Sequence, residues 1–129
     1  MVQRWVHDLD AFNKVPVAEQ ERIVGRKKPD SAALTDEARH PQGHLARTQI
    51  YEDGKLVEIF RRGVPFGTLN TQGLYIAAFS AERRRFDLML AAMFGTSQDG
   101  ETDRLTDYTR PTSGAFYFAP SLTAWRSCT

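Results

Sequence analysis

The sequence is poor in several features that define major classes of protein. Among its 129 residues there is a single cysteine, Cys128, so an intrachain disulfide and a thiolate metal cluster are both excluded, and a reducing compartment is expected. No apolar run approaches the length that spans a bilayer. Charged residues interrupt the opening residues, which argues against a signal peptide. We therefore expect a cytoplasmic protein that has no membrane partner.

An excess of charge of one sign is lacking too. The 17 lysine and arginine residues are balanced by 16 aspartate and glutamate residues, for a net charge of +1. Such a balance provides no field over the whole protein that would attract nucleic acid. The sequence also lacks a nucleophile elbow, a P-loop, zinc-ligand spacing and a dinucleotide-binding fingerprint. The segment "GTSQDG" at 95–100 is typical of a loop after a helix.

What is present is enough apolar material for one domain. The length and the hydrophobic content of 41% are those of a single globular domain with one core. The predicted strands are 2–8, the two arms of a hairpin within 45–63, 74–81 and 114–121, and the predicted helical segments lie within 8–26 and at 82–95. Residues 26–43 and 64–73 are predicted to be loops.

Local signals support these boundaries. Asp10 is suited to cap the first helical segment within 8–26. Pro16 suits the first turn of a second segment, which Gly25 is placed to end. Asp53-Gly54 supplies two positions for positive φ in a tight hairpin turn. Ser80 and Gly95 can begin and end the helix predicted at 82–95. Four apolar residues of that helix share one face and are expected to be ordinary core: Phe86, Met89, Leu90 and Met93.

The order of the elements predicts the fold class. Strand, helix, strand with an extra hairpin arm, strand, helix and strand make a βαββαβ order, the split ferredoxin-like pattern of an α+β domain. Helices then cover one face of an antiparallel sheet. Residues 74–81, "LYIAAFSA", are nearly all apolar, so we expect a central strand that is buried on both faces. Because this fold hosts many functions, the function must be sought in particular side chains.

The three histidines are the first candidates. His40 and His44, in "HPQGHLARTQI", have the spacing of two ligands on one helix face, but Pro41 and Gly43 interrupt such a helix. At most one of them is expected to bind a metal, and His44, at the mouth of a strand, is the better held; the alternative is a polar loop. His7, in the first strand, is expected to pack or to point to solvent.

Basic and acidic residues supply further candidates. Arg61 and Arg62 end an apolar run beside a glycine-rich loop, where they are either solvated or face an anionic group. The run 26–28, "RKK", suits the negative end of the preceding helix without any ligand. Asp103 and Asp107 precede the last predicted strand, and either could accept a hydrogen bond from a histidine ring.

Seven blocks along the chain resemble the dye-decolourising peroxidases, most of all their bacterial intracellular branch. The blocks are "QRWVHDL", "ERIVGRKK", "GHLARTQI", "EIFRRGVPFG", "GLYIAAFS", "MFG" and "GAFYFAPS". The resemblance runs along essentially all of residues 1–129 and covers only the C-terminal half of such an enzyme. That half is the second of two ferredoxin-like domains, of the dimeric α/β-barrel type, and it carries the heme. The strand that opens at Val2 likewise suggests that the chain continues a longer one.

The resemblance implies roles for four residues. His44 matches the axial ligand of the iron of heme b, and Asp103 matches the carboxylate that accepts the N–H of that imidazole. Arg61 matches the catalytic arginine on the side of the heme where peroxide binds, and Arg26 matches an arginine near the heme propionates. The implied activity is oxidation of dyes or small phenolic donors by hydrogen peroxide, in a cytoplasmic homo-oligomer.

Two departures from the family leave other functions open. The GxxDG motif, which supplies a distal aspartate upstream of this region, is absent, and Gly63 stands where close relatives often carry a polar side chain. A non-catalytic heme-binding or assembly module left by truncation is therefore the main alternative. A heme-free dimeric ferredoxin-like protein is the third.

Overall fold

The computed structural model describes residues 1–127, so Cys128 lies outside the described part. Four strands form one antiparallel sheet in the order β4-β5-β1-β6. Their bounds are Val2–His7 for β1, Phe60–Gly67 for β4, Gln72–Phe79 for β5 and Thr109–Ala115 for β6. In this order β1 and β4 run parallel with β5 between them, and β6 pairs with the far side of β1. This is the predicted split ferredoxin-like arrangement.

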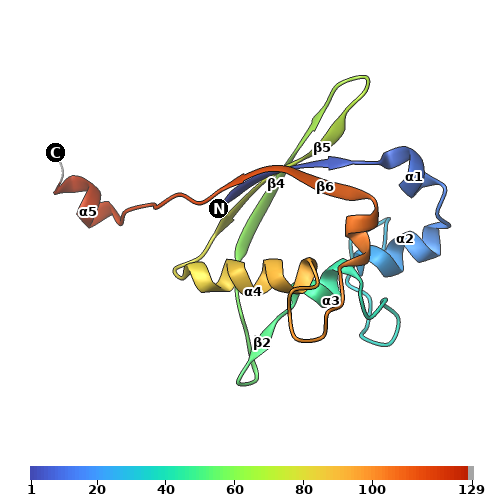
Figure 1. The fold of residues 1–129 in the computed structure, drawn as a ribbon, viewed down its shortest axis with the longest axis horizontal. Coiled ribbons are helices and arrows are strands. Elements are labelled where there is room, and N and C mark those ends of the chain that lie inside the picture. The colour runs from blue at the N-terminus through green and yellow to red at the C-terminus, as the bar shows by residue number, and fades with distance from the viewer. Residues whose placement is uncertain (128–129) are drawn as a thin grey trace.

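The helices gather on one side of the sheet (Figure 1). They are α1 (Leu9–Asn13), α2 (Val17–Val24), α3 (His44–Thr48) and α4 (Arg83–Met93), with a 3₁₀ helix, η1, at Arg104–Asp107. A last helix, α5 (Leu122–Arg126), lies at the end of an extended arm away from the body. No helix within residues 1–127 has the length and apolar character that a membrane crossing requires.

The core lies between the sheet and α4. Its buried side chains are Met1, Trp5, Ala78, Phe86, Met89 and Met93. Alternation along β1 sends Trp5 toward the helices, whereas Val2 is 41% exposed on the opposite face. The three α4 residues of this core belong to the predicted apolar face of that helix, so the assignment of the methionines to the core is confirmed.

Helix ends follow the predicted chemistry in part. Gly25 ends α2 with a φ of 84°, which glycine adopts without strain. The cap of α1 is Asp8 rather than Asp10, because the Asp8 carboxylate accepts the N–H of Ala11 at 2.9 Å. The Ser80 hydroxyl accepts the N–H of Glu82, one turn before the body of α4.

The predicted loop at 64–73 is wrong, because most of it is strand. Phe60–Gly67 and Gln72–Phe79 pair along their whole length and turn at 68–71. Pro65 lies within β4, where the sequence suggested a break. It is tolerated because β4 is an edge strand, so a missing N–H need not cost a ladder hydrogen bond.

The last strand and the burial of β5 also differ from expectation. The strand predicted at 114–121 is instead β6, Thr109–Ala115, an edge strand that accommodates Pro111 beside a register shift. Residues beyond it form the arm, where Phe118 is 90% exposed. The strand β5 is covered on one face only, and Tyr75 and Phe79 are exposed on the other.

The predicted hairpin within 45–63 is present in reduced form. Asp53 and Gly54 adopt φ values of 50° and 74°, which confirms the tight turn. Its arms are only β2 (Tyr51–Glu52) and β3 (Lys55–Leu56), which form a separate two-stranded sheet. Residues 44–48, which were expected to lead into the first arm, form α3 instead.

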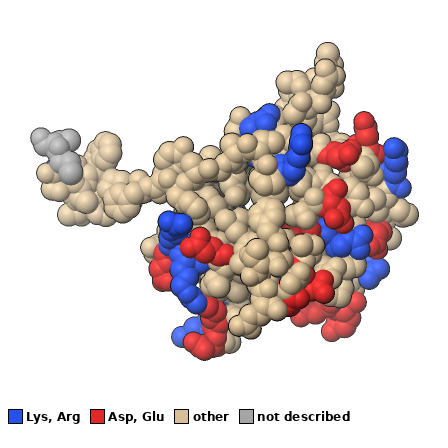
Figure 2. Space-filling view, viewed as in Figure 1, with Lys and Arg blue, Asp and Glu red and all other residues tan. Residues whose placement is uncertain are grey.

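Charged side chains of both signs lie next to one another over the body of the molecule (Figure 2). In this view the arm beyond β6 shows no charged side chain. The mixed surface agrees with the near-neutral composition.

Gly73 offers a test of the packing between β1 and β5. A Cβ added there would meet the Trp5 carbonyl oxygen at 1.9 Å, so we expect Gly73→Ala to lower the free energy of unfolding by about 1–3 kcal/mol. Gly114→Ala is the matched control in the same sheet, since its Cβ would make only ordinary contacts, at 3.5 Å with the Gln3 side chain and at 4.0 Å with the Val2 carbonyl oxygen. Urea unfolding of both variants measures the difference, and equal stability would contradict the tight β1–β5 contact.

Candidate functional site

A histidine and a buried aspartate form the centre of the candidate site. His44 Nδ1 lies 2.6 Å from Asp103 Oδ2, although 59 residues separate the two in the sequence. The Asp103 side chain is completely buried, and the His44 side chain is 31% exposed. A buried ionised carboxylate can only accept hydrogen bonds, so Nδ1 carries the ring proton. The second ring nitrogen, Nε2, is then left as the basic atom of His44.

The local fold fixes both members of this pair. Asp103 is the N-cap of η1, and its second oxygen accepts the N–H of Leu105 at 2.8 Å. His44 is the first residue of α3 and follows the N-cap Gly43. A Cβ on Gly43 would lie 2.7 Å from the Arg22 carbonyl oxygen, so only glycine lets the start of α3 approach α2 this closely. His44 therefore begins a helix, and the expectation that it stands at the mouth of a strand is wrong.

His44 and Asp103 line a cavity between the sheet and the helical layer. The other lining residues are largely apolar and come from β1, β4, β5, α4, η1 and β6: Met1, Gln3, Trp5, His7, Arg61, Gly63, Leu74, Ile76, Ala78, Met89, Met93, Leu105, Thr106 and Thr109. His44 reaches the cavity from the helical layer, and β4 forms part of the sheet on the other side. An apolar cavity with a few convergent polar groups is the usual form of a cofactor or ligand site.

Arg61 is the cation of this cavity. It lies on β4, and its guanidinium donates a weak hydrogen bond to the Met89 sulfur at 3.5 Å. Part of the side chain is exposed, but enough of it is withdrawn from water that burial, and then the charge of Arg26, lower the pKa of Arg61. Within residues 1–127 it has no carboxylate partner. A guanidinium without a carboxylate partner at the wall of an apolar cavity is suited to an anion or to developing negative charge.

The other candidate residues lie outside the cavity lining. Arg62 points to the opposite face of the sheet, with its guanidinium 5.1 Å from the centroid of the Phe60 ring. Arg26 donates to the Ser31 carbonyl at 2.9 Å and shares an adjacent hollow with Arg61. Asp107 forms an ion pair with Arg104. Of Asp103 and Asp107, it is therefore Asp103 that accepts a hydrogen bond from a histidine ring.

His40 is also outside the cavity lining. Its Nδ1 accepts the N–H of Gln42 at 3.1 Å, and this bond helps to shape the turn before α3. Gly63 does line the cavity, and a Cβ there would make only an ordinary contact of 3.6 Å with Leu74. The backbone therefore leaves room for a side chain at the position where this chain has none.

His7 is a cavity residue that the sequence did not identify. Its Nδ1 lies 2.6 Å from the Thr109 hydroxyl, which in turn donates to the Val6 carbonyl at 3.2 Å. This relay makes Nδ1 the protonated nitrogen of His7, and burial lowers the pKa of the ring. The period-2 alternation that sends Trp5 inward sends His7 the same way, so the signal was present in the sequence.

Comparison with known proteins gives one consistent family. The family model described as "Dyp-type peroxidase, C-terminal" matches residues 1–124. The dye-decolorizing peroxidase of Mycolicibacterium paratuberculosis (strain ATCC BAA-968 / K-10) is 34% identical over 124 residues, which cover 94% of this chain and 35% of the relative. That of Rhodococcus erythropolis (strain PR4 / NBRC 100887) is 32% identical over the same length. The chain thus spans about a third of the curated relatives it matches.

Solved structures agree with this result. A dye-decolorizing protein from V. cholerae is 38% identical and superimposes with a TM-score of 0.87, over 98% of this chain and 42% of its own. A Rhodococcus jostii RHA1 DypB variant in complex with heme is 32% identical and gives a TM-score of 0.91 over the same shares of the two chains. These likenesses establish the ferredoxin-like fold for the chain.

His7 gives a prediction for the pH dependence of stability. Its pKa is lowered in the folded chain, so the unfolded chain takes up the proton first as the pH falls. The contribution of neutral His7 to the stability of the fold is present above the pKa of His7 in the unfolded chain, about 6.5. It is lost as the pH falls through the lower pKa of His7 in the folded chain. We therefore expect the stability advantage of wild type over His7→Gln, measured by urea unfolding, to shrink between pH 7.5 and pH 5.5. A constant difference would mean that His7 does not titrate in this way.

Proposed function

Because the chain belongs to the Dyp-type peroxidase family, whose C-terminal domain it matches over residues 1–124, we propose that it is the heme-binding part of a dye-decolourising peroxidase. Such an enzyme uses hydrogen peroxide to oxidise dyes or small phenolic donors. The observation that carries the proposal is the His44–Asp103 pair, which leaves one basic imidazole nitrogen at the wall of an apolar cavity that Arg61 also lines.

The donor set of the cavity fits a heme. Heme iron takes its four in-plane ligands from the porphyrin, so the protein needs to supply one imidazole rather than a cluster of ligands. His44 offers that imidazole, and its second nitrogen is already engaged by a carboxylate, as is usual for histidines that bind metals. The methionine, leucine and isoleucine side chains of the lining suit the apolar faces of a porphyrin.

The protein side chains have distinct tasks in this proposal. The bound heme supplies the redox chemistry with peroxide. Asp103 holds the Nδ1 proton of His44 and so would make Nε2 a more electron-rich donor to a bound iron. Arg61 keeps a permanent positive charge near the peroxide oxygens, where negative charge develops. Arg26, which adjoins Arg61 outside the cavity lining, is proposed to face the propionate edge.

The names of the relatives favour an enzyme over a non-catalytic heme-binding module. The curated relatives are named dye-decolorizing peroxidases. Since the chain covers about a third of their length, its own turnover depends on how much of the distal machinery lies within it. A cytoplasmic location and a homo-oligomeric state are further parts of this proposal, and hydrogen peroxide and small aromatic reductants are its proposed partners.

Heme binding through His44 is the first test of this function. The chain is mixed with hemin, and the absorption spectrum of the bound heme is compared among wild type, His44→Ala and His40→Ala. We expect His44→Ala to lose the histidine-ligated spectrum and His40→Ala to retain it, because His40 contacts Gln42 outside the cavity. The reverse result would assign the ligand to His40, and no binding by wild type would refute the heme proposal.

Arg61 is the second test, with its neighbour as the control. In the hemin-loaded chain we expect Arg61→Leu to slow the initial reaction with hydrogen peroxide by about 10²–10³-fold, the usual effect of losing one preorganised donor. Heme content is expected to stay close to wild type, since the axial ligand comes from α3. Arg62→Leu should be nearly silent, because Arg62 lies on the opposite face. Stopped-flow absorbance measures the rates, and equal rates for wild type and Arg61→Leu would remove Arg61 from the reaction.

A further inference from the structure

The His44–Asp103 pair depends on two separate segments staying in contact. His44 begins α3, whereas Asp103 follows the loop 95–102, which connects α4 to η1. Asp103 itself is tied to α4 by its backbone N–H, which donates to the Met93 carbonyl at 2.9 Å. The loop between Met93 and Asp103 contains Gly95 and Gly100, both with positive φ, and is largely exposed. Gln42, just before α3, accepts the Arg104 N–H at 2.8 Å and donates to the Glu101 carboxylate. The rest of the loop needs a contact from α3 itself.

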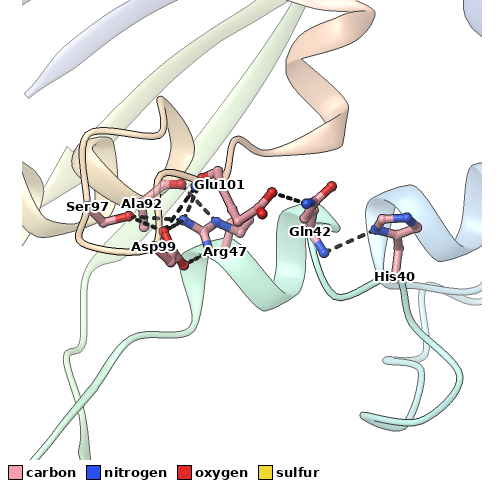
Figure 3. A network of polar contacts seen from close by, with 7 residues as sticks. All are labelled: His40, Gln42, Arg47, Ala92, Ser97, Asp99 and Glu101. Carbon is pink, nitrogen blue, oxygen red and sulfur yellow. Dashed lines mark hydrogen bonds and ion pairs between the residues drawn. The ribbon is translucent and has the colours of Figure 1, made fainter.

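Arg47, one turn after His44 on α3, makes that connection (Figure 3). Its guanidinium forms a bidentate pair with Asp99, at 2.6 Å to Oδ2 and 3.1 Å to Oδ1. It also donates to the carbonyl oxygens of Ala92 at 2.8 Å and Glu101 at 2.7 Å, and to the Ser97 hydroxyl at 3.2 Å. One side chain thus joins α3 to the end of α4 and to both ends of the loop.

The arginine of this ion pair is much less exposed than that of the other bidentate pair, between Arg84 and Glu52. The Arg47 side chain is only 11% exposed, whereas that of Arg84, which also pairs with a carboxylate through two nitrogens, is 60% exposed. The fork of an arginine is rigid, so a bidentate pair fixes orientation as well as distance. Hydrogen bonds from Arg47 and Ser97 keep the pKa of Asp99 far below its ordinary value, so the pair stays charged over the working pH range.

We infer that Arg47 is a positioning residue, which holds the loop 95–102 against α3 and so keeps Asp103 in hydrogen-bonding contact with His44. The functional consequence of this role rests on the proposed function. If His44 binds heme iron, the strength of its hydrogen bond to Asp103 sets how electron-rich the imidazole is. Arg47 does not line the cavity, so its proposed route to the site is through Asp103.

Three substitutions separate this role from ordinary stabilisation. Arg47→Met keeps an unbranched stem and removes every donor. Arg47→Lys keeps the charge but cannot form the fork, so it should give an intermediate result. Glu52→Gln breaks the exposed pair with Arg84, which lies on the hairpin side of α4, and serves as the matched control.

The first measurement uses the chain without heme. The Nδ1 proton of His44 is protected from water by its bond to a buried carboxylate, so its exchange rate, followed by NMR on ¹⁵N-histidine-labelled protein, reports on the pair. We expect exchange to be faster in Arg47→Met than in wild type, intermediate in Arg47→Lys and unchanged in Glu52→Gln. Unchanged exchange in a folded Arg47→Met would overturn the inference, whether or not the chain binds heme.

The second measurement uses the hemin-loaded chain and a double-mutant cycle with Asp103→Asn. Weakening the bond to the imidazole makes the ligand less electron-rich, so the reduction potential of the heme should shift to more positive values in Arg47→Met, in the same direction as in Asp103→Asn. If Arg47 acts through Asp103, the Arg47→Met shift should vanish in the Asp103→Asn background. An equal shift in both backgrounds would show that Arg47 stabilises the chain without acting through Asp103. Failure of the wild-type chain to bind hemin would refute the proposed function and leave the result of the exchange measurement unaffected.

Discussion

The hydrogen bond between His44 Nδ1 and the buried carboxylate of Asp103 determines how the elements around the site are arranged. A carboxylate without solvent exposure is costly unless its oxygens are satisfied, and here one oxygen takes the imidazole and the other takes the Leu105 N–H. Both hydrogen bonds form only when the start of α3 lies against the start of η1. The absence of a side chain at Gly43 lets the start of α3 lie close to α2 at the same time, because α2 leaves no space for a side chain there.

The one-sided sheet determines which side chains reach the cavity. Helices cover the face that carries Trp5, His7 and Arg61, and the cavity forms where α4 and α3 leave that face partly uncovered. The other face keeps Tyr75 and Phe79 exposed. Neighbouring residues on a strand therefore meet different surroundings, and this is why Arg61 and Arg62, adjacent in sequence, differ in chemistry.

The family match extends over residues 1–124 and shows the family of the chain. The pairing of His44 with Asp103 is a separate observation, a contact between elements far apart in sequence. The chain spans about a third of its relatives. Its own residues supply the cavity with the His44–Asp103 pair from the helical side and with Arg61 from β4, whereas Gly63 adds no side chain to that strand's part of the lining.

The sequence by itself determined the class of fold and the face of α4 that packs in the core. Periodicity sufficed for α4, the positive-φ glycine ended α2, and Asp53-Gly54 specified its turn, because each of these signals acts over a few residues. Tertiary structure decided the rest. The strand β4 continues through Pro65, and β6 forms from polar residues, because backbone pairing at a sheet edge outweighs side-chain propensity there. The burial of Asp103 and the contacts of Arg47 with the loop 95–102 depend on segments far apart in sequence, which no local pattern encodes.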